Sequence, residues 1–117
     1  MVKLQNECGY INIANDVFTI LTGDAATKCF GVKGMAVRSV TDGLVHLLKR
    51  ESMGKGVRIT YNDDRTIAIE LHIAIDMGVN IPVVCGSIAD EVRYKVTKGT
   101  GVEIKSIDIF IDSMILG

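Results

Sequence analysis

Two histidines and three cysteines are the side chains of this sequence best suited to metal binding or covalent chemistry. His46 and His72 are 26 residues apart, and neither forms an HxH or HxxxH pair of the kind that holds a metal ion. The cysteines form an odd, widely spaced set without a CxxC pair: Cys8, Cys29 and Cys85. This set predicts neither a disulfide framework nor a zinc site, and it is typical of free thiols in a reducing compartment. We therefore expect no metal and no cofactor.

Two further features have precedents as catalytic groups. Cys85 follows the start of a predicted helix, where the helix dipole lowers a thiol pKa, but its place on an apolar stripe favours burial. Asp63 and Asp64 are adjacent carboxylates, but adjacent acids in a hairpin turn are commonly solvated turn residues. The sequence thus predicts no catalytic residue, and we expect a protein that is not an enzyme.

Basic residues are concentrated in one segment, although the formal net charge of the chain is only −1. Residues 28–58 hold seven Lys or Arg and two Asp or Glu, a balance of +5, whereas the rest of the chain has a balance of −6. Such asymmetry suits an anionic membrane surface, a nucleic acid or the acidic half of a second copy, while the alternative is a scatter of charges over a solvated surface. The candidate interaction surface comprises Lys28, Gly31, Lys33, Gly34, Arg38, Lys49, Arg50, Lys55 and Arg58.

A GxxG sequence, Gly31 to Gly34, lies inside this basic segment and between two predicted helices. The predicted order of elements around it is that of a KH module, which clamps single-stranded nucleic acid with such a loop. Lys and Arg nearby would contact phosphates. Against this interpretation, a KH loop opens its second helix directly, whereas here Met35 to Val40 intervene. A KH-like nucleic-acid-binding module is therefore the alternative function.

The clearest elements are a strand and the helix that follows it. From Ile67 to Ile75 every odd position is apolar, which predicts a half-buried strand with its odd side toward the core. Asn80 can cap a following helix, Pro82 suits its first turn, and Gly99 to Gly101 supplies a stop. The apolar stripe of this helix consists of Ile81, Val84, Cys85, Ile88, Val92 and Val96.

The other expected elements complete one α+β domain spanning residues 1–117. We expect a strand at 9–14, a helix at 15–30, a loop with at most a short strand at 31–40, a short helix at 41–51 and a strand at 57–61 hairpinned to the strand at 67–75. In the last strand, 102–111, the apolar parity slips, which predicts a β-bulge near Lys105 and Ser106. The order is strand, helix, helix, strand, strand, helix, strand, so we expect one mixed sheet packed against about three helices.

Length and hydropathy set the remaining expectations. A chain of 117 residues is long enough to bury one core. No apolar run approaches the ~20 residues that span a bilayer, and the N-terminus lacks the apolar stretch of a secretory signal. We therefore expect a cytoplasmic protein without a direct membrane span.

Several short sequences together resemble those of a known family. They are the IxIA sequence of Ile11 to Ala14, the Ala25-Ala26 pair, the GVKGM and DGLVHLLKR segments and, above all, GVNIPVV followed by a helix. In this combination and order, from about Gly9 to Ile111, the chain resembles the bacterial alkaline shock protein family, also called the envelope stress response family. It departs from the family pattern at Val83 to Gly86, where members tend to place a Glu and small residues.

This resemblance implies a small cytoplasmic protein of Gram-positive-type bacteria, tied to envelope or alkaline stress. It implies a non-catalytic interaction or scaffold protein that self-associates and can be held peripherally at the membrane by a membrane-anchored partner, and it supplies no catalytic residues. Combined with the charge distribution, it suggests head-to-tail association in which the basic segment meets acids of another copy around Glu70, Asp76, Glu103, Asp108 or Asp112.

Overall fold

A computed structural model describes residues 2–38, 45–48 and 54–116 of the protein. The described residues form seven strands and two helices. In chain order they are β1 (Val2–Asn6), β2 (Gly9–Ile13), α1 (Asn15–Thr27), β3 (Val32–Arg38), β4 (Val45–Leu47), β5 (Val57–Tyr61), β6 (Ile67–Asp76), α2 (Ile81–Thr100) and β7 (Ile104–Ile115).

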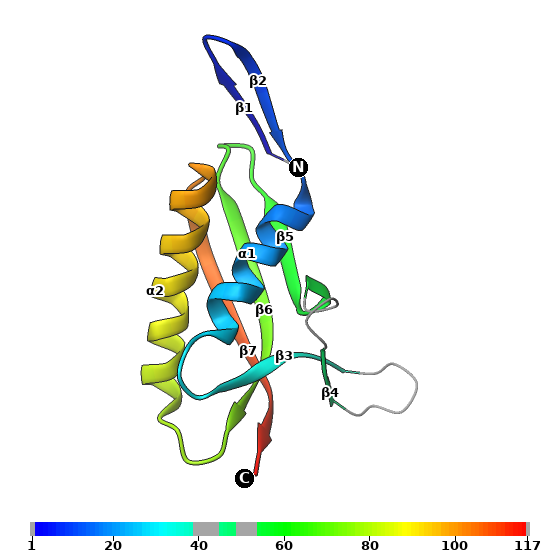
Figure 1. Cartoon of the computed structure of the whole chain (residues 1–117), viewed down its shortest axis with the longest axis vertical. Coiled ribbons are helices and arrows are strands. Elements are labelled where there is room, and N and C mark those ends of the chain that lie inside the picture. The colour runs from blue at the N-terminus through cyan, green and yellow to red at the C-terminus, as the bar shows by residue number, and fades with distance from the viewer. Residues whose placement is uncertain (1, 39–44, 49–53, 117) are drawn as a thin grey trace.

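Strand β6 is the centre of the larger, five-stranded sheet (Figure 1). Strand β7 runs parallel to it over the whole range from Ile67 to Asp76. Strand β5 pairs antiparallel with residues 67–71 of β6, and β3 pairs antiparallel with residues 73–75. Because β7 occupies one edge of β6 throughout, β5 and β3 share the other edge, one after the other.

Both helices cover the same face of this sheet (Figure 1). The odd-numbered apolar side chains of β6 face them, and all five are at most 1% exposed, as the alternation in the sequence predicts. Facing them are Phe18 from α1 and the α2 stripe of Val84, Ile88, Val92 and Val96. The even-numbered side chains of β6 and their neighbours lie on the other side of the sheet, which neither described helix covers; we call it the open face.

The predicted limits of α2 are confirmed. The Asn80 side chain accepts a hydrogen bond from the Val83 backbone N–H at 3.2 Å, and Pro82 lies in the first turn, where no amide donor is needed. Gly101 ends the helix with φ of 77°, in the left-handed region, and its N–H donates to the Thr97 carbonyl. The helix therefore begins and ends where local sequence signals place it.

The predicted bulge in the last strand is also confirmed. The register between β6 and β7 slips at Lys105, since Ile67 pairs with Ile104 while Ala68 pairs with Ser106. A second slip, not predicted, occurs at Asp112. Between the two bulges, Ser106 to Ile111 pair regularly with β6.

The expectation of one sheet against about three helices is wrong. The class is α+β, but the described residues form two helices and seven strands in two sheets. The short helix expected at 41–51 is replaced, over Val45–Leu47, by strand β4, which pairs with Ala36–Arg38 of β3; the rest of that expected helix lies outside the described residues. Over so few residues, the apolar spacing of Val45–Leu47 fits a helix and a strand equally well. Pairing with β3 favours the strand.

The strand expected at 9–14 is confirmed as β2 (Gly9–Ile13), but it lies outside the main sheet. Gly9–Ile13 pairs with Val2–Asn6, an element that the sequence reading omitted, and the two form a separate hairpin that projects from the body (Figure 1). The stretch 31–40, expected to be a loop with at most a short strand, contains the seven-residue strand β3. Helix α1 ends at Thr27, three residues earlier than expected.

The burial of β6 predicts a large cost for truncating it. Ile73→Ala removes a fully buried side chain between β3 and β7, so we expect the free energy of unfolding to fall by about 2–5 kcal/mol. Urea denaturation followed by circular dichroism measures this change. Ile20→Ala is the matched control, because Ile20 is 56% exposed on α1 and should cost less than about 0.5 kcal/mol. Equal costs for the two variants would contradict this account of the core.

Candidate functional site

A group of interacting ionisable side chains on the open face surrounds His72. Its Nδ1 lies 2.9 Å from Asp112 Oδ2, and its Nε2 lies 3.2 Å from Glu70 Oε2. The Phe110 ring stacks on the imidazole with 4.8 Å between ring centres. The ring donates to both carboxylates only when both of its nitrogens carry a proton. Strands β6 and β7 position all four groups, because these residues alternate with the buried ones.

This geometry does not resemble a metal or catalytic centre. The two carboxylates contact opposite nitrogens of His72 and do not converge on a common point. Among the described residues, no group of three His, Cys, Asp or Glu side chains is arranged to hold a metal ion. Both ring nitrogens already face carboxylates, so in this arrangement neither is placed to take a proton from a nucleophile.

A third acid next to this cluster has no ion-pair partner among the described residues. Asp108 on β7 is the direct neighbour of Glu70 on β6 and lies on the same face of the sheet. The described contacts give Asp108 no ion pair or hydrogen bond, while His72 is already shared by Glu70 and Asp112. Like charges in neighbouring register positions repel, so Asp108 repels Glu70, whose neighbour on the other side is Arg58 of β5.

A hollow of about 600 Å³ lies beside His72 on the open face. Lys55 and Arg58, two members of the candidate interaction surface, line this hollow together with Glu70, His72 and Asp112. Gly56 is also in its wall, where an added Cβ would lie 3.1 Å from the Ala36 carbonyl oxygen, so the backbone passes close to β3 here. Basic and acidic groups of the same chain thus meet in this hollow.

The other described basic members of the candidate interaction surface do not line this hollow. Lys28 pairs with Asp24 at 3.0 Å on α1, and Lys33 pairs with Asp76 at 3.6 Å. Lys49 and Arg50 lie outside the described residues, and only the backbone of Arg38, at the end of β3, is described. The structure thus brings Lys55 and Arg58 together and separates them from Lys28 and Lys33. That the whole set serves as one interaction surface stays a prediction.

The GxxG sequence lies largely within a strand. Gly34 pairs with Ala74 inside β3, and Gly31, just before β3, has φ of 88°. An added Cβ at Gly31 would lie 3.0 Å from Val79 and 3.2 Å from Val84, so this glycine allows the chain to turn tightly against the start of α2. A KH clamp needs the GxxG loop to lead into a helix, and here strand β3 follows it. The described residues therefore do not have the KH-type order of elements that the alternative function assumed.

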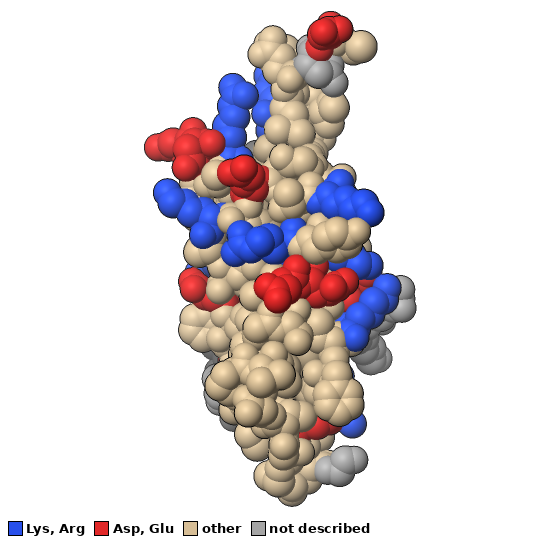
Figure 2. Space-filling model, turned by 90° about the vertical axis from the view of Figure 1, so that its left-hand side faces the viewer, with Lys and Arg blue, Asp and Glu red and all other residues tan. Residues whose placement is uncertain are grey.

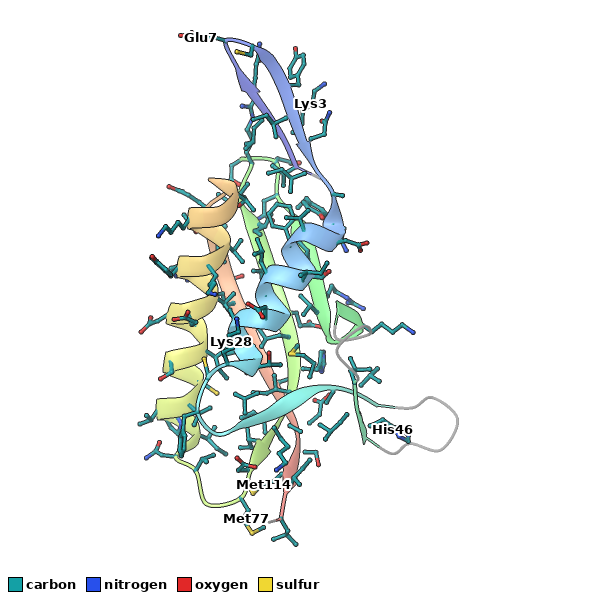
Figure 3. The ribbon with its side chains drawn as sticks, in the orientation of Figure 1. Lys3, Glu7, Lys28, His46, Met77 and Met114 are labelled. Atoms are coloured by element: carbon teal, nitrogen blue, oxygen red, sulfur yellow. The ribbon has the colours of Figure 1, made fainter. Side chains whose placement is uncertain are left out.

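The predicted turn acids and thiols have structural roles. Asp64 Oδ1 accepts hydrogen bonds from the Thr66 hydroxyl at 2.6 Å and the Thr66 N–H at 3.1 Å, and these bonds hold the pKa of the Asp64 carboxyl below its ordinary value. Partial burial raises the pKa of both the Cys85 and the Cys29 thiols above their ordinary values. Desolvation is the cause of the rise at Cys85, and it works against activation of this thiol. His46 lies on β4 (Figure 3), not on the short helix that was expected there.

A different feature, which the sequence reading missed, is an exposed apolar end of the molecule. Phe30 is 91% exposed, Val83 is 64% exposed and Leu116 is 74% exposed. Met77 and Met114 lie together at the same end (Figure 3), where the Met77 N–H donates to the Ile115 carbonyl. We call the set of Phe30, Met77, Ile81, Val83, Met114 and Leu116 the apolar end.

Charged side chains are almost absent from the apolar end in the view of Figure 2, whereas they crowd the middle and upper parts of that face. A hollow of about 500 Å³ opens between Phe30, Met77 and Val83. The sequence gives only a weak signal for the apolar end, because its six residues come from three separate segments. These segments are the turn after α1, the β6–α2 junction, and the C-terminal part of β7 with the residue that follows it. Contiguous exposed apolar patches of this kind mark interaction sites on many proteins.

Comparison with known proteins identifies the family. The family model for alkaline shock protein 23, described as having a cell envelope-related function, matches residues 3–116. The chain belongs to the alkaline shock protein family. The resemblance seen in the sequence is thereby confirmed.

Relatives with this family likeness occur in Bacillus and Streptococcus. The uncharacterized protein YloU of Bacillus subtilis is 29% identical over 97% of this chain and 94% of its own length. The uncharacterized protein Spy1614 of Streptococcus pyogenes serotype M6 is 28% identical over 97% of this chain and 93% of its own length. The uncharacterized protein YqhY of B. subtilis is 31% identical over 95% of this chain and 83% of its own length. No solved structure matches the chain significantly.

The raised thiol pKa values predict slow alkylation of two of the three cysteines. At pH 8 the Cys85 and Cys29 thiols hold less thiolate than an ordinary thiol, and thiolate is the reactive form. We expect iodoacetamide to modify the exposed Cys8 first, as followed by peptide mass spectrometry of the folded chain. In urea, where the chain is unfolded, the alkylation rates of the three cysteines should converge. Rapid labelling of Cys85 in the folded protein would revive the activated-thiol interpretation.

The uncompensated acid on the open face predicts a stabilising substitution. Asp108→Asn removes the repulsion from Glu70 and should raise the free energy of unfolding by roughly 0.2–1 kcal/mol, measured by urea denaturation. The gain should shrink in high salt, because salt screens exposed charges. Asp63→Asn, in the turn before β6, serves as the control and should change stability little. A loss of stability in Asp108→Asn would show that Asp108 has a favourable partner.

Proposed function

We propose that this protein is a non-catalytic interaction or scaffold protein of the cell envelope stress response, and that it self-associates through its apolar end. Membership of a family with a cell envelope-related function supports the setting. The apolar end itself carries the proposal, because six large apolar side chains there are between 39% and 91% exposed. Burying such surface against another protein is the main favourable contribution to association.

The chemistry of the apolar end favours a second copy of the same chain as its occupant. Two apolar ends meet without bringing like charges together, since the nearby charges of Lys33 and Asp76 neutralise each other within one chain. A contact between identical patches closes around a twofold axis and gives a dimer. Contact between the apolar end and another surface of the next copy gives an open chain of copies instead.

Charge complementarity between copies is a second contribution, weaker than the sequence suggested. Of the acids expected to receive the basic segment, Asp76 is paired with Lys33, and Glu70 and Asp112 are paired with His72. Pairs between exposed side chains contribute only about 0–1 kcal/mol each. Salt separates the two contributions, because charge pairing weakens as salt is raised whereas apolar contact does not.

Attachment to the membrane, in this proposal, occurs through a membrane-anchored partner. Neither described helix is long and apolar enough to cross a membrane. In this proposal a second protein, or the protein's own assembly, keeps it at the membrane surface. The proposal includes no catalytic residue and no cofactor.

Val83→Glu tests the proposal by placing a charge in the apolar end. Val83 is the third residue of α2, where an acid interacts favourably with the helix dipole, so the fold should remain stable. Multi-angle light scattering after size exclusion should show wild-type oligomers that grow with concentration and persist in high salt. The Val83→Glu variant should run as a monomer.

Val17→Glu is the matched control. Val17 is also a β-branched third residue of a helix, 41% exposed on α1, and it is not part of the apolar end. This variant should associate like the wild type. A wild-type chain that stays monomeric at high concentration would overturn self-association. Assembly that Val83→Glu leaves intact, and that salt abolishes, would assign association to charge pairing instead.

A further inference from the structure

Strand β7 is an open edge of the main sheet. Over its twelve residues it pairs with β6 on one side, and it has no other partner strand among the described residues. The bulges at Lys105 and Asp112 bound a regular stretch of six residues, Ser106 to Ile111. An open edge of this length presents unpaired backbone donors and acceptors, and it is a template for an added strand.

The side chains of β7 are also incompletely covered. Ile107, Ile109 and Ile111 point toward the helices but are only partly buried, whereas the β6 residues beside them are at most 1% exposed. An adjoining strand with apolar side chains on the same face would complete this burial.

A groove runs beside the start of β7. It has a volume of about 730 Å³ and is lined by α2 side chains, among them Arg93, Tyr94 and Lys98, and by Glu103 and Ile104. Here Arg93 Nη1 donates to the Ile104 carbonyl oxygen at 2.7 Å. A side chain thus satisfies a carbonyl of β7 at this end, and space remains alongside it.

The charges of the open face indicate the chemistry of the added strand. Asp108 lies at the centre of the regular stretch, beside Glu70, and has no cation of its own among the described contacts. A Lys or Arg on the neighbouring strand would face it directly, at the distance of a cross-strand pair.

A second copy of β7 fits this edge poorly. Two β7 strands related by a twofold axis would place Asp108 and Asp112 of both copies on one face, and like charges at such distances repel. The strand has one basic residue, Lys105, which is at a bulge and pairs with Asp64 at 3.7 Å.

The geometry points to β7 as an acceptor for an extended segment of another protein, in which apolar residues alternate with Lys or Arg. The segment adds to the edge between the bulges. Its apolar side chains lie beside Ile107, Ile109 and Ile111, and its basic side chains face Asp108 and the Glu70–His72–Asp112 cluster. Main-chain hydrogen bonds supply the affinity and the alternating side chains supply the specificity.

This inference rests on the proposed role in protein interaction but uses a different surface from the apolar end. A binding test therefore uses the Val83→Glu variant as well as the wild-type chain, so that self-association does not contribute. If the wild-type chain self-associates but does not bind the peptide, only the β7 inference is overturned. If the wild-type chain is monomeric but binds the peptide, only the proposed self-association is overturned.

The probe is a fluorescent eight-residue peptide of alternating valine and lysine, followed by fluorescence anisotropy at low salt. We expect saturable binding, and we expect slower amide hydrogen exchange in β7 than in the free protein. Two matched peptides separate the contributions: one with glutamate for lysine, and one with a central proline, which cannot complete the backbone pairing. Both should bind much more weakly.

Asp108→Asn should weaken binding of the lysine peptide by about two- to fivefold, the effect expected of one exposed charge pair. Asp63→Asn, which removes an acid outside the sheet, should leave the affinity unchanged. The inference is overturned if the lysine peptide does not bind, if the proline peptide binds as well as its parent, or if the protected amides lie outside β7. Equal binding of the glutamate peptide would overturn the assignment of a basic segment.

Discussion

The structure depends on the register of strand β6. Its odd-numbered side chains are buried under both helices, and it is paired along both edges, so a slip of one residue would move five buried aliphatic side chains to the opposite face. That cost fixes which side chains of β6 reach the open face. Glu70 and His72 lie on the open face because the burial of Ile69, Leu71 and Ile73 fixes those side chains on the opposite face.

The connection from β6 to β7 follows from the same constraint. Parallel neighbours need a crossover, and helix α2 supplies it while covering the buried face of the strand that precedes it. The crossover places β7 at the outside of the sheet, where no described strand pairs with its outer edge. It also brings the β6–α2 junction next to the end of β7, where the Met77 N–H bonds to the Ile115 carbonyl. The open edge and the apolar end are thus two consequences of one connection.

Periodic signals in the sequence predicted the centre of this fold well. The alternation of β6, the caps of α2 and the bulge at Lys105 are local properties, and all three are confirmed. Strand β1 was not predicted and β4 was predicted as part of a helix, because each is short and its conformation depends on pairing with a neighbouring strand, β2 or β3. Charge counted along the chain also did not reveal that Lys33 and Asp76 neutralise each other. The apolar end escaped notice because its residues come from segments that only the folded chain brings together.

The two proposed surfaces differ in what they can contribute to an assembly. Apolar contact is strong but undiscriminating, since any apolar patch of suitable shape gains from burial. Charges around an interface contribute less to affinity and more to the choice of partner and register. A chain with its charged side chains on the open face and its exposed apolar side chains at one end separates these two roles. The apolar end suits a contact that every copy of the protein makes. The edge beside Asp108 suits a contact with a segment of particular sequence, because there both the backbone and the alternating charges must match.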